Sequence, residues 1–166
     1  MATKAVGNVF YKARKEASSW NDRLASREGA AEETGLDRTR LAYIELNTLN
    51  PHPVEVLILS DAYNAPELCN HYCAKMCPLG MQIVAEVEVT ELERAVLQLL
   101  NAFKTLPTIK ESLIEIAADG VIDEDEKPTM ENILARLDEV ANCIQALKIY
   151  FKKAIGYSTS AKQNKL

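Results

Sequence analysis

The chain has 166 residues, of which 48% are hydrophobic and 26% charged, a balance that is ordinary for a soluble globular protein. No apolar run approaches the length of about 18 residues that a membrane span needs. The N-terminus also lacks the apolar core of a secretory signal, so we expect a cytoplasmic protein. The net charge is −5, with 9 basic against 10 acidic residues in 1–80 and 10 against 14 in 81–166. A DNA-binding protein usually carries a basic surface, so this charge excludes a broad nucleic-acid footprint and permits only a local one, or one that a dimer concentrates.

The sequence predicts an all-α fold, because it contains only six Gly and six Pro, and aromatic residues make up 6%. Ser26 can cap a helix that runs to Gly35, where a helix end favours a left-handed residue, and Asp37 can cap the next helix. Gly29 lies inside the first of these two helices, where it costs up to about 1 kcal/mol relative to Ala. In a first domain, residues 1–78, we therefore expect five helices at 8–18, 27–34, 38–46, 54–63 and from about 64 to 78.

The two helices at 27–34 and 38–46 have the spacing of a helix-turn-helix. Leu36, Leu41 and Ile44 are expected to face inward and to fix the angle between the helices. In such a motif the first helix crosses the DNA backbone and the second lays its N-terminal residues in the major groove. Arg can bind guanine bidentately, and Thr can contact a base edge or a thymine methyl group. The pattern therefore predicts a DNA-contacting face made of Arg38, Thr39, Arg40 and Tyr43.

The segment between residues 24 and 51 also matches a known family pattern, at Leu24, Ser26, Glu28, Ala31, Thr34, Gly35, Leu36, Arg38, Leu41, Ile44, Glu45 and Pro51. With these residues the chain resembles the Cro/C1-type (XRE) helix-turn-helix regulator family over about residues 8–66. The resemblance implies a five-helix, lambda-repressor-like domain in which Arg27 contacts phosphate and the residues of the DNA-contacting face meet bases. The sequence departs from the family where Arg27 replaces a Gln, Ala30 replaces a Leu, and Leu46-Asn47 replaces an Asn-Gly pair.

Charged residues of both signs are expected to be exposed around this face. The helix at 8–18 should turn Lys12, Arg14 and Lys15 outward. Each nearby carboxylate repels DNA phosphates, although salt screens the repulsion within about 8–10 Å. A helix-turn-helix fold that binds protein instead, as an antirepressor or adaptor, is therefore the alternative. The four carboxylates concerned are Glu28, Glu32, Glu33 and Asp37.

Three cysteines, Cys69, Cys73 and Cys77, follow one another at intervals of four in the helix expected to end near residue 78. Clustered cysteines in a cytosolic protein suggest zinc or an iron–sulfur cluster before a disulfide. Cys69 and Cys77 would be about 12 Å apart along a straight helix, too far for one zinc ion unless the helix ends early. The alternative is that all three pack as small apolar residues on one helix face. A fourth metal ligand would have to come from His52, His71, Cys143 or another subunit.

The segment from Cys73 to Gly80 has the form Cys-x-x-x-Cys-Pro-Leu-Gly, and the residues after it are β-branched and alternate loosely. In this arrangement the whole chain resembles a clostridial and phage-type group of these regulators, which join such a segment to a C-terminal helical pair. We predict an extended linker over 79–89, a helical oligomerisation domain over 90–155 and a disordered tail over 156–166.

The most regular element of the sequence is its last helix, where Met130 begins an apolar repeat with steps of three and four. Such a repeat over three heptads is typical of a helix-pairing face. It packs either within the chain, against Leu92–Phe103, or between two subunits. A dimer suits a protein that reads two half-sites about 34 Å apart. We therefore predict a homodimer interface at Ile133, Leu137, Val140, Ile144, Leu147 and Phe151.

Together these features predict an all-α, repressor-like transcriptional regulator that binds double-stranded DNA as a dimer through a helix-turn-helix domain and pairs through a C-terminal helical hairpin. We expect no enzymatic activity, because no oxyanion-hole loop accompanies the cysteines and histidines. Two alternatives stay open. One is the protein-binding adaptor, and the other is a metal or redox sensor in which the cysteine segment gates the same DNA binding.

Overall fold

The computed structural model describes residues 5–118 and 120–163, with side chains described as far as Gly156. No strand occurs among these residues, and the regular segments are helices, which confirms the all-α prediction. They form two compact units: the chain up to Glu86 together with the chain from Lys152 onward, and Val87–Phe151. None of the helices described combines the length and apolar character that a membrane span requires.

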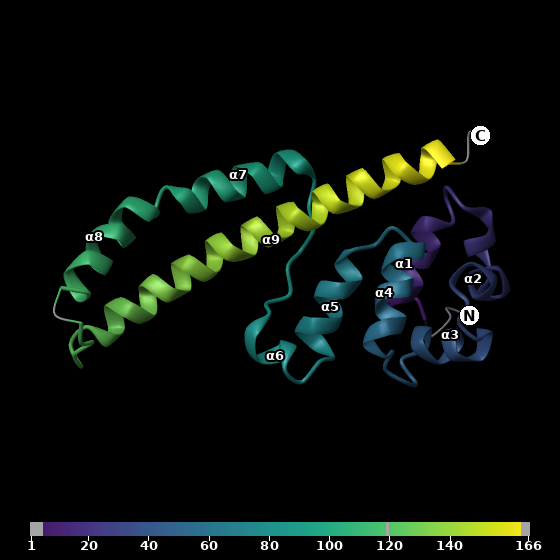
Figure 1. Cartoon of the computed structure of the whole chain (residues 1–166), viewed down its shortest axis with the longest axis horizontal. Helices are drawn as coiled ribbons and strands as arrows, with labels where there is room; N and C mark the ends of the chain where they lie inside the picture. The colour runs from purple at the N-terminus through teal and green to yellow at the C-terminus, as the bar shows by residue number, and fades with distance from the viewer. Residues whose placement is uncertain (1–4, 119, 164–166) are drawn as a thin grey trace. The chain divides into compact units, whose positions relative to one another are not determined.

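The helices of the first unit lie close to the predicted ranges, and the predicted caps are formed. The Ser26 hydroxyl accepts a hydrogen bond from the Gly29 amide at 3.0 Å, and Asp37 accepts one from the Arg40 amide at 2.9 Å. Gly35 ends its helix in the left-handed conformation, with φ 68°. The elements, labelled in Figure 1, are α1 Val9–Ala17, the 3-10 helix η1 Asp22–Ala25, α2 Arg27–Thr34, α3 Arg38–Glu45, α4 Pro53–Ala62, α5 Glu67–Lys75 and α6 Gly80–Ile83.

One apolar core holds these helices together. Leu41 and Ile44 are buried, as predicted, and Leu36 packs against the core from a partly buried position. Burial of each large apolar side chain contributes roughly 1.5–3 kcal/mol. The largest apolar side chains that are almost fully buried are Phe10, Leu24, Leu41, Ile44, Val56, Leu59 and Leu68.

Gly29 lies where η1 passes closest to α2. A Cβ atom on Gly29 would lie 2.1 Å from the carbonyl oxygen of Arg23, a backbone atom that cannot swing away. Gly80 is placed in the same way against α5, where a Cβ atom would lie 2.3 Å from the Cys73 carbonyl oxygen. At both positions the lack of a side chain allows close backbone packing, which offsets the helix-propensity cost of glycine.

The segment 79–89 differs from the extended linker predicted for it. Its first part forms α6, and the chain becomes extended at Val84. Asn70 Nδ2 donates a hydrogen bond to the Ala85 carbonyl oxygen at 3.0 Å, so the segment is held along α5. The prediction was wrong over α6 because the β-branched pattern carries no information about this contact with a neighbouring helix.

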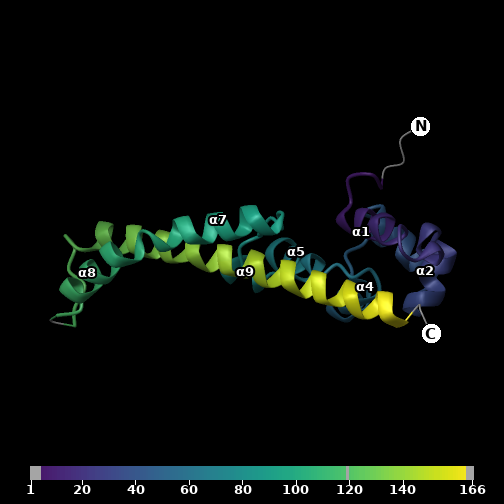
Figure 2. The same ribbon diagram turned by 90° about the horizontal axis from the view of Figure 1, so that it is seen from above.

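The second unit consists of α7 Leu92–Phe103, α8 Leu106–Ile116 and the first part of α9 Lys127–Gln163. Figures 1 and 2 both show α9 running antiparallel beside α7 and α8. Ile109 and Ile116 of α8 pack on Ile133 of α9. The six residues predicted to form a homodimer interface on α9, here called the seam, differ in burial. Ile133 and Val140 are buried, Ile144 and Leu147 are partly buried, and Leu137 and Phe151 are 37% and 47% exposed.

The end of α9 belongs to the first unit, and the disordered tail predicted over 156–166 is helical as far as Gln163, beyond which lie residues outside the described part. The Lys153 ammonium pairs with Glu67 at 2.7 Å and with Glu16 at 3.0 Å. Burial disfavours the charged ammonium, but the hydrogen bonds to these carboxylates outweigh it and raise the pKa of Lys153. The prediction of disorder rested on the polar composition of the tail, which does not exclude a helix that continues from an element packed on a neighbour.

The close approach at Gly29 predicts that Gly29→Ala destabilises the protein, whereas helix propensity predicts that it stabilises the protein. Propensity alone predicts that Gly29→Ala stabilises the protein by up to about 1 kcal/mol. Because the added methyl group would overlap the Arg23 carbonyl, we expect the free energy of unfolding to fall by about 1–3 kcal/mol. Urea denaturation followed by circular dichroism measures the change. Gly7→Ala is the control, since a Cβ atom there meets nothing within 4 Å. A Gly29→Ala protein at least as stable as the wild type would contradict the packing described.

Candidate nucleic-acid interface

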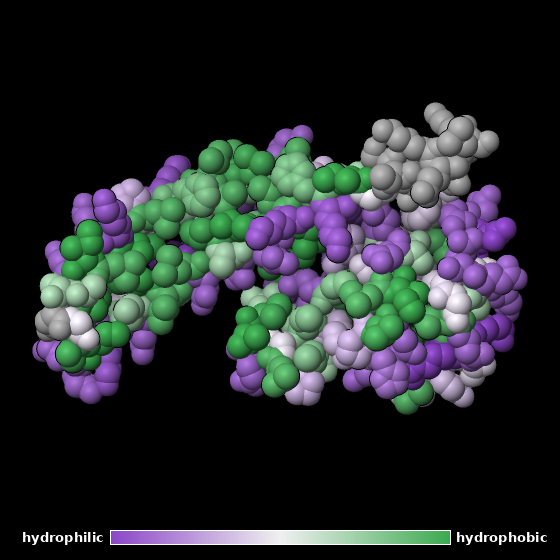
Figure 3. Space-filling model, viewed as in Figure 1, coloured by the Kyte–Doolittle hydropathy of each residue, from purple (hydrophilic) through white to green (hydrophobic). Residues whose placement is uncertain are grey.

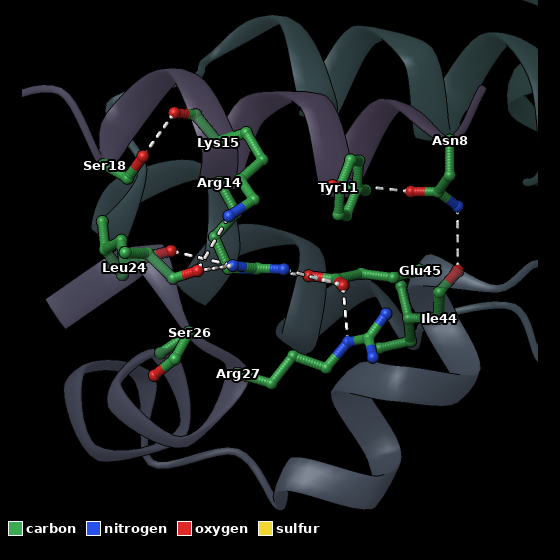
Figure 4. A network of polar contacts seen from close by, with 12 residues as sticks. Asn8, Tyr11, Arg14, Lys15, Ser18, Leu24, Ser26, Arg27, Ile44 and Glu45 are labelled. Carbon is green, nitrogen blue, oxygen red and sulfur yellow. Dashed lines mark hydrogen bonds and ion pairs between the residues drawn. The ribbon is translucent and has the colours of Figure 1, made fainter. Parts of the chain in front are cut away.

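A buried carboxylate joins the three helices that surround the predicted DNA-contacting face. Glu45, at the end of α3, has a side chain only 2% exposed. Its Oε1 accepts a hydrogen bond from Arg14 Nε at 2.5 Å. Its Oε2 accepts bonds from Arg14 Nη2 at 3.0 Å and from Arg27 Nε at 2.7 Å. Figure 4 shows the two guanidinium groups meeting this one carboxylate from α1 and α2.

Arg14 contradicts the sequence prediction, which turned it outward with Lys12 and Lys15. It is 2% exposed, and its Nη1 also donates to the carbonyl oxygens of Leu24 at 2.8 Å and Ala25 at 3.2 Å. Burial disfavours the charged guanidinium, but the hydrogen bond and charge of Glu45 outweigh it and raise the pKa of Arg14. The position of Arg14 one residue after Ala13 and three before Ala17 in the apolar stripe of α1 was the available signal.

Arg40 is held by the structure rather than presented to solvent. Its Nε and Nη2 donate to the two oxygens of Glu55, both at 2.7 Å, and Nη2 also donates to the Asn50 carbonyl oxygen at 2.9 Å. Glu55 in turn accepts a hydrogen bond from the His52 amide at 2.6 Å. The hydrogen bond with Glu55 raises the pKa of Arg40, and the same bond lowers the pKa of Glu55. Arg40 therefore fastens the loop before α4 to α3.

The remaining predicted residues of α3 are accessible. Thr39 is exposed, Tyr43 is 43% exposed, and the Arg38 side chain is 62% exposed. Arg38 forms an ion pair with Glu28, whose side chain is equally exposed. Water screens such a pair, so it holds Arg38 only weakly. The structure thus divides the predicted set into accessible Arg38, Thr39 and Tyr43 and the tethered Arg27 and Arg40.

An open hollow of about 240 Å³ lies beside the first residues of α2 and α3. Four of its lining residues are cations and one is a carboxylate. Lys15 reaches it from α1 while its Nζ donates to the Ala25 carbonyl oxygen at 2.9 Å. The cations exceed the nearby carboxylates of Glu28 and Glu45 by two charges, so the hollow attracts anions. It is lined by Tyr11, Arg14, Lys15, Arg27, Glu28 and Arg38.

The structure does not bring the three cysteines into one metal site. Cys69 and Cys73 lie on α5, Cys77 follows it, and all three thiols are free and partly buried. Within the described part of the chain, no group of three or more His, Cys, Asp or Glu side chains is placed to hold a metal ion. His71 instead meets Glu86, with 2.6 Å between Nδ1 and Oε1. Cys69 packs against the core of the first unit, which agrees with the apolar alternative for this one of the three cysteines.

The Glu45 contacts predict a large and specific loss of stability on Glu45→Gln. An uncharged amide leaves Arg14 and Arg27 without their counter-charge in a buried site, and breaking such a pair costs about 3–5 kcal/mol. Chemical denaturation measures this loss. Glu139→Gln, in the exposed pair with Arg136, is the matched control and should leave stability unchanged. Equal stabilities of the two variants would refute the role assigned to Glu45.

The Arg40–Glu55 pair predicts a dependence of stability on pH. Because the folded protein lowers the pKa of Glu55 below its ordinary value of 4.5, the pair stabilises the fold above that pH, and the contribution is lost as pH falls below it. Glu55→Gln should therefore be less stable than the wild type at neutral pH, and the difference should shrink under acid conditions. Thermal melts across this range test the prediction, and a difference independent of pH would contradict it.

Comparison with known proteins adds no family to this description. No family model matches the chain, and the searches of curated proteins and of solved structures find no match. Function is therefore proposed from the residues of the interface itself.

Proposed function

We propose that the chain is a sequence-specific DNA-binding transcriptional regulator, in which α2 and α3 act as a helix-turn-helix and α3 enters the major groove. The observation that carries the proposal is the accessible set Arg38, Thr39 and Tyr43 on α3, next to a cationic hollow at the start of α2. Arg and Thr read base edges, and a cationic hollow beside them suits a backbone phosphate. The resemblance to the XRE family supports the same assignment.

The ion pairs that hold α3 to α1, α2 and α4 support this assignment. A helix that reads bases has to keep its orientation, because a reader that is ordered only on binding pays for that order in affinity. The Glu45 contacts join the end of α3 to α1 and α2, and the Arg40–Glu55 pair joins its start to α4. Arg27 and Arg40 then position α3, and the base contacts fall to the accessible residues.

The pairing of Arg38 with Glu28 has a consequence for affinity. When DNA approaches, Arg38 exchanges Glu28 for a base edge or phosphate, and the exposed pair offers little resistance to the exchange. Glu28 then stays beside the phosphates as an uncompensated negative charge. The acidic surface therefore weakens binding without preventing it, which suits a regulator that needs two copies to hold an operator.

A protein-binding module is the second candidate. It is favoured by the pairing of each predicted arginine with a carboxylate, namely Arg27 with Glu45, Arg38 with Glu28 and Arg40 with Glu55. Such a surface offers few unpaired cations and suits a polar protein partner. Phosphate-driven affinity falls steeply as salt rises, so the salt dependence of binding to duplex DNA separates the two candidates.

Paired substitutions at the α2–α3 face test the proposal. Arg38→Ala should weaken binding to duplex DNA about tenfold or more, since a bidentate base contact is worth about 1–3 kcal/mol. Glu28→Gln should strengthen binding several-fold, because it removes the carboxylate nearest to Arg38. Fluorescence anisotropy with labelled duplex at several salt concentrations measures both effects.

Arg136→Ala is the matched control, since it removes an exposed arginine from an exposed ion pair on α9. It should bind DNA as the wild type does, and all of these proteins should have the same melting temperature. The proposal fails if the wild type does not bind duplex DNA at low salt. It also fails if Arg38→Ala and Arg136→Ala have the same affinity.

A further inference from the structure

The second unit has an apolar face that the unit itself leaves uncovered. Its core is small and consists of Ile109, Ile116 and Ile133, with a few partly buried neighbours. Among the described residues of this unit, nine large apolar side chains are 37–66% exposed, and Figure 3 shows apolar residues gathered along its helices. Apart from Val121 and Ile122, which precede α9, and Phe151, at the end of the unit, six of them lie where the helices run side by side. We call these six the apolar face: Leu97, Leu100 and Phe103 on α7, Ile114 on α8, and Leu134 and Leu137 on α9.

Five of the six residues lie on one side of the helical layer, and the sixth, Leu97, lies at its edge. At about 100° per residue, Leu100 and Phe103 of α7 are displaced from the buried Ala95 in one rotational sense, and Leu97 lies almost opposite Ala95. The α9 members are displaced from the buried Ile133 in the same sense, and Ile114 is displaced likewise from the buried Ile109. Because α9 runs antiparallel to α7 and α8 and beside them, equal senses of displacement lead to the same face of the layer.

The opposite side of the layer is polar. The residues displaced in the other sense include exposed, hydrophilic side chains on both long helices. One of them, Arg136, forms an exposed ion pair with Glu139 along α9. A layer with one polar and one apolar face is suited to solvent on the first side and to a protein partner on the second. The polar residues are Arg94, Gln98 and Asn101 on α7 and Asn132, Arg136 and Glu139 on α9.

We propose that the apolar face is covered by the same face of a second copy of this chain, in a two-fold dimer. An interface around a two-fold axis pairs one patch with itself, so it has to be self-complementary. The apolar members of the patch meet that condition, and the exposed charged residues displaced in the same sense, Lys110, Asp138 and Lys148, are of both signs. Six side chains about half exposed offer on the order of 600 Å², close to the roughly 800 Å² per partner of a standard interface. The proposal assigns a surface to the dimer through which the regulator would bind DNA, and it rests on the proposed function.

The proposal also moves the interface away from the predicted seam. Ile133 and Val140 are already buried within one copy, so they cannot form most of a contact with another. Only Leu137 belongs to both the seam and the apolar face. The interface is therefore centred on the sides of α7 and α9 rather than on the heptad positions of α9.

Sedimentation equilibrium of the full chain without DNA tests the proposal. The variant Leu100→Glu with Leu134→Glu places two carboxylates on the apolar face of each copy. It should raise the dimer dissociation constant at least about a hundredfold, which corresponds to a tenfold effect for each of the two substitutions. The control is Gln98→Glu with Asn132→Glu, which adds the same two charges to the polar face of the same helices and should remain a dimer.

Circular dichroism checks that the variants keep their helix content. If the apolar-face variant unfolds, the test is made on the wild type alone. Its melting temperature should rise with protein concentration, as that of a dimer does. A wild type that is monomeric at every concentration, with a constant melting temperature, overturns the proposal, as do equal dissociation constants for the two variants. DNA binding is measured separately with Arg38→Ala: loss of DNA binding in an intact dimer supports both assignments, and a dimer that never binds DNA refutes the proposed function alone.

Discussion

The buried carboxylate of Glu45 is the contact on which the first unit depends. It accepts three hydrogen bonds from two arginines, and Arg14 Nη1 also donates to the carbonyl oxygens of Leu24 and Ala25. A buried charge is tolerable only when it is paired and hydrogen-bonded, and this network pairs both charges and gives each several hydrogen bonds. The end of α3, the start of α2, the middle of α1 and the close of η1 are thereby fixed to one another. The apolar core alone, which is not directional, would hold them together but not at one orientation.

The same network determines which charges are left for a ligand. Arg27 and Arg40 are committed to Glu45 and Glu55, so the cationic residues that would define a nucleic-acid footprint are fewer than the composition suggests. Arg38, beside the hollow, pairs only with an exposed carboxylate and is free to exchange partners. The protein therefore combines a frame held by buried and partly buried ion pairs with a small, weakly charged face. Such a face is compatible with the net charge of −5 of a chain proposed to bind DNA.

The second unit differs from the first in that its helices leave many apolar side chains exposed. Its helices form a single layer, and a single layer has two faces but only one line of contact between neighbours. Side chains on that line, such as Ile133, are buried, while those beside it, such as Leu100 and Leu134, stay exposed. A second layer would bury them. The two units thus differ in how they bury apolar side chains. The first unit buries most of them in its own core, and the second leaves an apolar face that a further layer would have to cover.

Local chemistry by itself determined most of the helices of the first unit, because caps, breakers and apolar periodicity act within a few residues. Ser26, Gly35 and Asp37 marked the ends of α2 and α3 before any tertiary contact was known, and Leu41 and Ile44 marked their buried side. What only the tertiary structure decided is the partner of each charged or polar group. Arg14 appeared to be an outward residue, and Arg40 a base reader, because a guanidinium reveals its carboxylate only when helices distant in sequence meet. Gly29 looked like a cost for the same reason: the backbone of Arg23, which requires it, approaches α2 only in the folded chain.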